Sequence, residues 1–333
     1  MKNVKKIQPS GLKEIVGNPN LPERKPRKWN QPIETDWLVA NNELSGIRSE
    51  QEIAFLHTVF CQTSLPYRNP GDAARIWKRQ QGLAHLLITA GQIWRSESND
   101  WLPVGLPFGP KPRLILAYLS TQAIKTQRRV IPVGDSLTGF VRQLGLPTTG
   151  PSIRMLKEQL ARLAVTDFRL GYPEENEDVT RRANLITGIK LWFPKTQQRR
   201  VLWPNEVSLS PEYFESLLAH AVPLSEQAIA QLANNAMAFD VYTWLAQRLH
   251  RVPARRHHLV PWASLRDQFG QGYGRTRDFR RQFRATLKVA CRAYPEARLT
   301  EGHRGLILHH SKPPIPSCTG MRNLTQLTYT HCG

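Results

Sequence analysis

The sequence has no apolar run that approaches the ~20 residues needed to span a bilayer, which argues against a membrane protein. Its first residues, MKNVKKIQPSGLKE, include no apolar stretch after the lysines, so no secretory signal is expected. Cysteine is scarce, and Cys61, Cys291, Cys318 and Cys332 lack the paired spacing of a zinc site or a disulfide framework. We therefore expect free thiols and a cytoplasmic protein, without membrane partners.

The motifs of several enzyme classes are also missing. Glycine is never followed by lysine, so the phosphate-binding GxxxxGK[ST] loop of many ATPases is absent. The ten histidines form neither the His-x-His pair of DNA-nicking enzymes nor the His-x-x-Arg spacing of tyrosine recombinases. The doublets His257-His258 and His309-His310 make no preformed chelate, because adjacent side chains point in different directions. We expect no enzymatic activity, no bound metal and no cofactor.

Acidic residues are few relative to basic ones. The 333 residues contain 46 Lys and Arg against 26 Asp and Glu, which gives a formal net charge of +20 and a pI near 10.3. A field of this sign attracts nucleic acid. The length is sufficient for two domains.

The most basic segment is RTRDFRRQFRATLKVACR, residues 275–292. As a helix at about 100° per residue, it places Phe279, Phe283, Leu287 and Ala290 on one face and bases on another. One acid accompanies seven bases in this segment, whereas solvated helices usually mix both signs. The pattern predicts a helix that packs on a core with its aromatic face and contacts nucleic acid with its basic face.

The chain begins with a segment of low hydrophobicity. Residues 1–48 are rich in Lys, Arg, Pro and Asn, and we expect them to form a flexible basic arm. Capping-box spacing at Ser49 predicts a helix that includes Ile53 and Phe60. The run Leu83–Thr89 predicts a short buried strand.

Three helices are then expected in succession. Pro112 begins the first, Asp135 or Ser136 caps the second, and Gly145 ends it. The third runs from Pro151 to Leu163, and the second and third make a helix-turn-helix candidate. The segments DFRLGY, LITGIKLWF and RRVLW predict strands, the last two as a hairpin. The acidic segment PEENEDV is expected to be a mobile loop, and Pro204 marks a boundary.

The second half predicts the same order of elements. Ser210 and Pro211 begin a helix, Ser225 begins a longer one through His250, and RVPARRHH is a basic loop. A short helix WASLRDQF, a turn GQGYG and the arginine-rich helix form a second helix-turn-helix candidate, followed by a hairpin of ARLTEG and GLILHH. The expected fold class is therefore α+β, with two tandem winged-helix domains at 49–204 and 205–311 and a flexible tail at 312–333.

Several of these segments carry a resemblance that extends over residues 66–314. The chain resembles the RepA-type plasmid replication initiators in WKRQQGLAHLLITAG, LPFGPKPRLILAYLSTQAI, SLTGFVRQLGL, IKLWF, HAVPLSEQAI, FDVYTWLAQRL, WASLRDQFGQGY, RDFRRQF and YPEARL. The resemblance implies that the second domain reads repeated sites at a plasmid origin, while the first holds the DNA backbone or supports a homodimer. It also implies origin opening and recruitment of the host replication initiator and the replicative helicase.

The predicted DNA contacts fall into three groups. The arginine-rich helix contributes Arg275, Arg277, Arg280, Arg281, Arg284 and Lys288, the loop and hairpin of the second domain contribute Arg255, Arg256 and Arg304, and the first domain contributes Arg154, Lys157 and Arg162. Glu158 between the first-domain bases weakens that helix as a DNA-binding face. The alternatives are a transcriptional repressor without a role in initiation and an origin-nicking endonuclease.

Overall fold

The structure is a computed structural model of mixed α/β architecture. It describes residues 53–95, 98–133, 137–174, 177–183, 185–189 and 206–315. The expected arm at 1–48, the cap candidates Asp135 and Ser136, and the tail from residue 316 onward lie outside the described residues.

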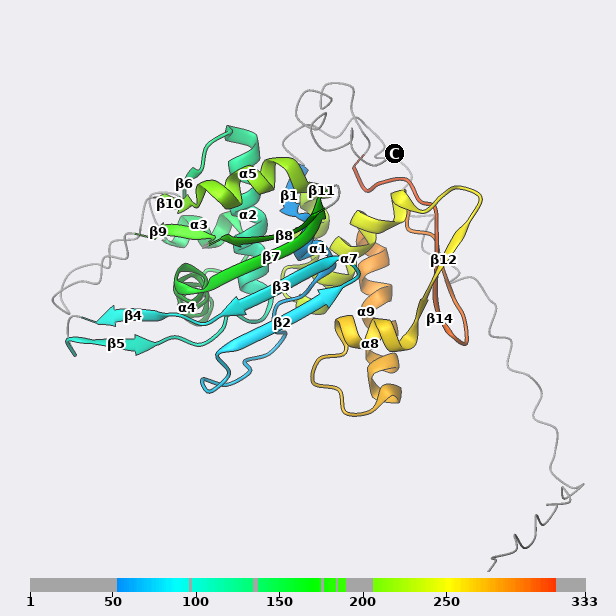
Figure 1. The fold of residues 1–333 in the computed structure, drawn as a ribbon, viewed down its shortest axis with the longest axis horizontal. Helices are drawn as coiled ribbons and strands as arrows, with labels where there is room; N and C mark the ends of the chain where they lie inside the picture. Colours follow the sequence, from blue (N-terminus) through cyan, green and yellow to red (C-terminus); the bar gives the residue numbers. More distant parts are fainter. Residues whose placement is uncertain are drawn as a thin grey trace, which may run out of the picture.

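Two segments of the chain share one order of elements: helix, strand, helix, helix and two further strands. In the first segment, strands β7 (Asp167–Glu174) and β8 (Glu177–Ala183) stand between the second helix of the pair and the last two strands. In each repeat the strand before the helix pair forms hydrogen bonds with the last strand, giving the sheet orders β6-β10-β9 and β12-β14-β13. Figure 1 places the second repeat on the right, with α9 between the first repeat and the β12–β14 pair. The first repeat comprises α2 (Pro110–Thr126), β6 (Val130–Pro132), α3 (Leu137–Gln143), α4 (Gly150–Val165), β9 (Ile186–Ile189) and β10 (Glu206–Leu209). The second comprises α7 (Ala236–Arg248), β12 (His257–Pro261), α8 (Trp262–Phe269), α9 (Thr276–Ala293), β13 (Leu299–Glu301) and β14 (Gly305–His309).

The remaining elements surround the first repeat and connect it to the second. A four-stranded sheet has the order β2-β3-β7-β8, and β4 and β5 form a separate hairpin. These elements are β1 (Ile53–His57), α1 (Thr58–Gln62), β2 (Ile76–Gln81), β3 (Ala84–Thr89), β4 (Gln92–Arg95), β5 (Asp100–Pro103), β7 (Asp167–Glu174), β8 (Glu177–Ala183), α5 (Pro211–His220), β11 (Ala221–Ser225), α6 (Glu226–Leu232) and the 3₁₀ turn η2 (Leu249–Arg251).

Local signals for helix ends are confirmed at several positions. The hydroxyl of Ser210 accepts a hydrogen bond from the backbone N–H of Tyr213 at 3.0 Å, and Pro211 occupies the first turn of α5. Gly145 follows α3 with a φ of 66°, a conformation that glycine adopts without strain. The strand expected at Leu83–Thr89 is β3, with alternate buried side chains.

The helix expected from Ser49 is wrong for its apolar part, because Ile53–His57 is strand β1. All five of its residues are buried, and it pairs antiparallel with β11, where Ile53 lies opposite Ser225. The pairing partner is far away in the sequence, so a short apolar run could be assigned to a helix as easily as to a strand. A helix begins only at Thr58, where the His57 side chain accepts from the backbone N–H of Val59.

Three further expectations, about a helix and two loops, are corrected by the structure. The helix from Ser225 to His250 is two helices, because the side chain of Asn235 caps α7 by accepting from the backbone N–H of Ala238 at 3.0 Å. The described residues of the acidic segment PEENEDV, 173–174 and 177–179, belong to the paired strands β7 and β8, in which Pro173 lies opposite Asp178. The end of the basic loop RVPARRHH is the start of β12.

The start of the expected tail is also packed. The hydroxyl of Tyr294 donates to the backbone carbonyl of Lys312 at 2.7 Å, and Ile315 is buried. Residues 312–315 therefore extend the folded part of the chain beyond the boundary expected at residue 311.

The two repeats share a hydrophobic core. The pairing of β1 with β11 joins segments from both halves, and β10 completes the sheet of the first repeat beyond residue 204. Helix α7 packs against α1, α2 and α9. At the centre of this contact, the guanidinium of Arg113 on α2 forms two hydrogen bonds with the carboxylate of Asp240 on α7, at 2.7 and 2.8 Å. This ion pair therefore links α2 and α7, the first helices of the two repeats, directly.

Candidate nucleic-acid interface

Helix α9 has the two faces expected from its sequence. Phe279, Phe283, Leu287 and Ala290 are buried. The ring of Phe283 packs against Phe269 of α8 with 5.5 Å between ring centroids. Because large aromatic side chains dominate the energetics of a core, this face determines how the helix is rotated about its axis.

The opposite face of α9 presents basic side chains to solvent. Arg277, Arg281, Lys288 and Arg292 are exposed, and the side chain of Arg281 retains 81% of its accessible surface. Arg275 is exposed at the residue before the helix. These side chains form a row about 25 Å long, as follows from the 1.5 Å rise per helical residue.

Arg280 and Arg284 are held against the protein instead of extending into solvent. Their guanidinium carbons lie 5.1 and 5.4 Å from the ring centroid of Trp262, which is buried at the start of α8. Arg284 also forms an ion pair with Glu301 of β13 at 2.6 Å. The sequence predicted both arginines as DNA contacts, but it contained no signal for the acid and the indole that restrain them.

Arg266 holds the turn between α8 and α9. Its guanidinium donates to the Thr276 hydroxyl at 3.0 Å and to the carbonyls of Gly274 and Tyr273 at 3.1 and 3.3 Å. Gly272 in the same turn has a φ of 79°, which favours glycine. Arg266 therefore has a structural role in the helix-turn-helix that the charge pattern did not reveal.

The three remaining residues of the second repeat that were predicted to contact DNA lie at opposite ends of its sheet. Arg304 is exposed in the β13–β14 turn, directly before Gly305, which pairs with Pro261. Arg255 and Arg256 are exposed before His257, at the other end of β12. A five-residue strand is about 16 Å long, so the structure does not bring these two groups together.

The first repeat presents a weaker basic surface on α4. Arg154 is exposed and Lys157 is partly buried. The prediction for Arg162 is not supported, because its side chain is buried and donates to Glu158 at 2.7 Å and to the carbonyl of Leu106 at 2.9 Å. Helical periodicity could not show that the segment at Leu106 covers this part of α4.

A buried histidine cluster lies away from these basic surfaces. The Nδ1 atom of His57 accepts from the backbone N–H of Val59, so in the neutral ring Nε2 carries the proton and donates to the Ser216 hydroxyl at 3.0 Å. A catalytic histidine would instead accept the serine proton. Burial, and to a smaller extent the nearby His220, lower the pKa of His57 to about 3. The cluster therefore stabilises the fold rather than activating Ser216.

The low pKa of His57 predicts acid sensitivity. Its folded pKa of about 3 lies below the ordinary value of 6.5, so its stabilisation is complete above 6.5 and is lost as the pH falls toward 3. Between about pH 7.5 and 5 this group alone should lower the free energy of unfolding by about 2 kcal/mol. Urea unfolding of the wild type and His57→Gln at both pH values measures the difference. His303→Gln, an exposed control, should retain the wild-type pH dependence, and an equally steep His57→Gln variant would contradict the assignment.

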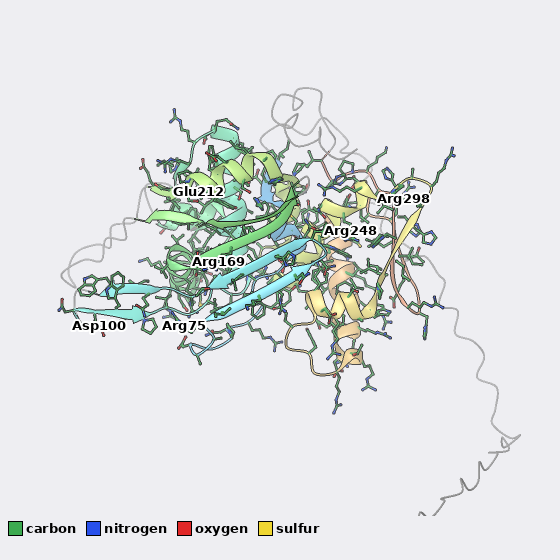
Figure 2. The ribbon with its side chains drawn as sticks, in the orientation of Figure 1. Arg75, Asp100, Arg169, Glu212, Arg248 and Arg298 are labelled. Carbon is green, nitrogen blue, oxygen red and sulfur yellow. The ribbon has the colours of Figure 1, made fainter. Side chains whose placement is uncertain are left out.

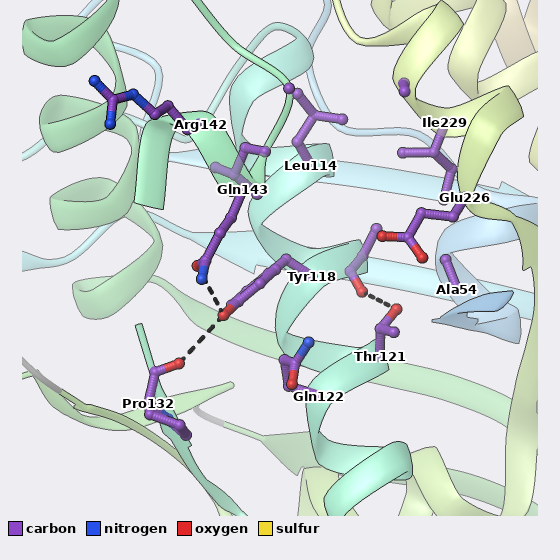
Figure 3. Close-up of a pocket in the computed structure, with 14 residues that line it drawn as sticks. Ala54, Leu114, Tyr118, Thr121, Gln122, Pro132, Arg142, Gln143, Glu226 and Ile229 are labelled. Atoms are coloured by element: carbon purple, nitrogen blue, oxygen red, sulfur yellow. Dashed lines mark hydrogen bonds between the residues drawn. The ribbon is translucent and has the colours of Figure 1, made fainter. Parts of the chain in front are cut away.

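An open cavity of about 600 Å³ lies between α2, α3 and α6. Its lining combines apolar residues such as Leu114 and Ile229 with Tyr118, Arg142 and Glu226 (Figure 3). The Tyr118 hydroxyl contacts the Pro132 carbonyl and the Gln143 side chain, each at 3.2 Å. The Tyr118 hydroxyl is thus occupied by other groups of the wall.

Among the described residues, no group of three or more His, Cys, Asp or Glu side chains is placed to hold a metal ion. The rings of His257 and His309 stand on paired strands with 6.3 Å between their centroids. A helix with the length and apolar character needed to cross a membrane is also not found in this part of the chain.

The β4–β5 hairpin exposes aromatic side chains that the sequence did not single out. Trp94 and Trp101 face each other across the strands and are 43% and 55% exposed. Arg75 fixes the base of the hairpin by donating to the carbonyls of Ala90, Gly91 and Val104 at 2.8, 2.8 and 2.9 Å. Figure 2 shows Arg75 near this base and Asp100 at the far end.

Comparison with known proteins supports the family resemblance that was inferred from the sequence. Residues 106–263 match the family model described as plasmid-encoded RepA protein, which confirms the resemblance for that part of the chain. The crystal structure of RctB domains 2–3 is similar with a TM-score of 0.44 and 13% identity, over 75% of this chain and 94% of that chain. A structure of selenomethionine derivatives of the same domains has the same score and identity, over 71% and 85%. No curated protein sequence matches the chain.

Proposed function

We propose that this chain, in which residues 106–263 match the plasmid-encoded RepA family, is a non-enzymatic plasmid replication initiator that binds repeated double-stranded sites at its origin. The observation that carries the DNA-binding part is the exposed basic row of α9 beside the β13–β14 turn. Recognition helices enter the major groove, and arginine can form two hydrogen bonds with guanine.

The repeated order of elements supports two winged-helix domains. The pairs α3–α4 and α8–α9 are the helix-turn-helix units, and the strand pairs β9–β10 and β13–β14 are the wings. The second domain reads bases, whereas the first holds the DNA backbone or supports a homodimer. Opening of the origin and recruitment of the host initiator and replicative helicase complete the proposal.

One assay separates the initiator from the endonuclease. The protein is incubated with supercoiled plasmid that carries the DNA flanking its gene, in the presence of a divalent metal ion. Protection of repeated sites without a nicked product supports the proposal, and a nicked circle supports the endonuclease. A repressor would protect the same sites, but supplying the gene in trans would not allow a plasmid with only the flanking DNA to replicate.

The proposed division of roles predicts different effects in the two domains. Arg281→Ala should cost about 1 to 3 kcal/mol of binding free energy and relax the preference at one or two base pairs. Arg154→Ala should weaken binding to specific and random duplexes alike, because phosphate contacts carry no sequence information. Titrations with an origin duplex and a shuffled duplex measure both effects. Loss of discrimination in Arg154→Ala alone would reverse the two roles.

A further inference from the structure

We infer that Glu301 and Trp262 are positioning residues for Arg284, and that they make this arginine discriminate between bases instead of binding any phosphate. The inference rests on the proposed function and concerns the same surface of α9. It assigns a role to one acid and one buried aromatic residue that the charge pattern leaves unexplained.

The ion pair of Arg284 with Glu301 is close and directional. The Nε atom of Arg284 donates to Oε1 of Glu301 at 2.7 Å, and its Nη2 atom lies 2.6 Å from the same oxygen. The arginine side chain is 37% exposed and the glutamate side chain 23%. On the same helix face, Arg281 is 81% exposed and lies 3.6 Å from Asp278. Arg284 therefore has a defined direction, whereas Arg281 extends into solvent.

Trp262 provides a platform beneath the same guanidinium. Its ring centroid is 5.4 Å from the Arg284 guanidinium carbon, and its ring packs edge to face on Phe283 at 6.1 Å. Its backbone N–H donates to the carbonyl of Arg304 in the β13–β14 turn at 3.1 Å. The platform thus joins α8, α9 and the hairpin, so that the direction of Arg284 depends on the packing of all three.

This arrangement has two consequences for DNA binding. The carboxylate of Glu301 offsets the positive charge of Arg284 beside the basic row, which reduces attraction to phosphates of any sequence. The contacts with Glu301 are made by Nε and Nη2 of the guanidinium. Guanine presents O6 and N7 to a correctly oriented guanidinium, and a direction that is already fixed in the free protein favours this match over contact with a phosphate.

The test compares Glu301→Gln with Glu296→Gln, which makes the same change of charge at an exposed acid outside the ion pair. The probes are a duplex selected from a random pool by the wild-type protein and its shuffled counterpart. Glu301→Gln should bind the shuffled duplex about 3- to 10-fold more tightly, with a salt dependence steeper by about one phosphate contact, and should lose about tenfold in discrimination. Glu296→Gln should shift both affinities alike.

A second variant separates direction from charge. Arg284→Lys keeps the charge but lacks the planar fork, so it should also lose about tenfold in discrimination while its salt dependence stays close to that of the wild type. Melting curves establish that each variant is folded. Equal discrimination by Glu301→Gln and Glu296→Gln, or full discrimination by Arg284→Lys, overturns this inference alone. A wild-type protein that selects no sequence overturns the proposed function together with it.

Discussion

The affinity for duplex DNA should fall by about 10³ to 10⁵ between about 50 and 200 mM salt, because about 6 to 10 phosphate contacts release their counterions. The exposed row of Arg277, Arg281, Lys288 and Arg292 supplies part of these contacts, and the net charge of +20 provides a long-range attraction. The effect is large because each phosphate contact makes the binding constant fall with about the 0.9 power of the salt concentration.

Fluorescence anisotropy across a salt series measures this slope. Lys288→Ala should reduce the slope by about 0.9, because it removes one phosphate contact. Both Lys288→Ala and Arg281→Ala should leave the melting temperature nearly unchanged, because an exposed side chain contributes little to the fold. A fall in affinity of less than about tenfold over the whole range would be incompatible with an electrostatic interface.

Asp240→Ala should lower the free energy of unfolding by about 3 to 5 kcal/mol, because it leaves the Arg113 guanidinium buried without its carboxylate. Arg113 is only 3% exposed, and the pair connects the first helices of the two repeats. Arg113 also donates to the carbonyls of Leu65 and Gly109, at 2.8 and 2.7 Å. Removing its carboxylate therefore weakens the region in which the two halves meet.

Urea unfolding followed by circular dichroism measures this loss. Glu226→Ala is the matched control, because Glu226 lies 3.9 Å from Lys125 in an exposed pair that should contribute about 1 kcal/mol or less. The double variant Arg113→Met with Asp240→Leu should be more stable than Asp240→Ala, since neither charge remains buried. Equal losses for Asp240→Ala and Glu226→Ala would mean that water reaches the buried pair.

The sequence by itself determined the features that depend on a few neighbouring residues. Proline, glycine and serine signals located the starts of α2, α4 and α5 and the end of α3, because helix ends are satisfied by nearby side chains. The two faces of α9 followed from helical periodicity, because its aromatic and basic residues alternate with the 3.6-residue turn. The two successions of helices, α3 before α4 and α8 before α9, were recognisable for the same reason.

The tertiary structure decided which charges remain at the surface. Arg154 and Arg162 lie eight positions apart on one helix, yet the carbonyl of Leu106 accepts from Arg162 and the segment that carries it buries this side chain. Arg281 and Arg284 lie three positions apart on α9, but Arg284 pairs with an acid from β13 whereas Arg281 remains 81% exposed. The strand character of Ile53–His57 likewise depends on β11. Each outcome depends on a partner distant in the sequence, and periodicity contains no information about where the folded chain places that partner.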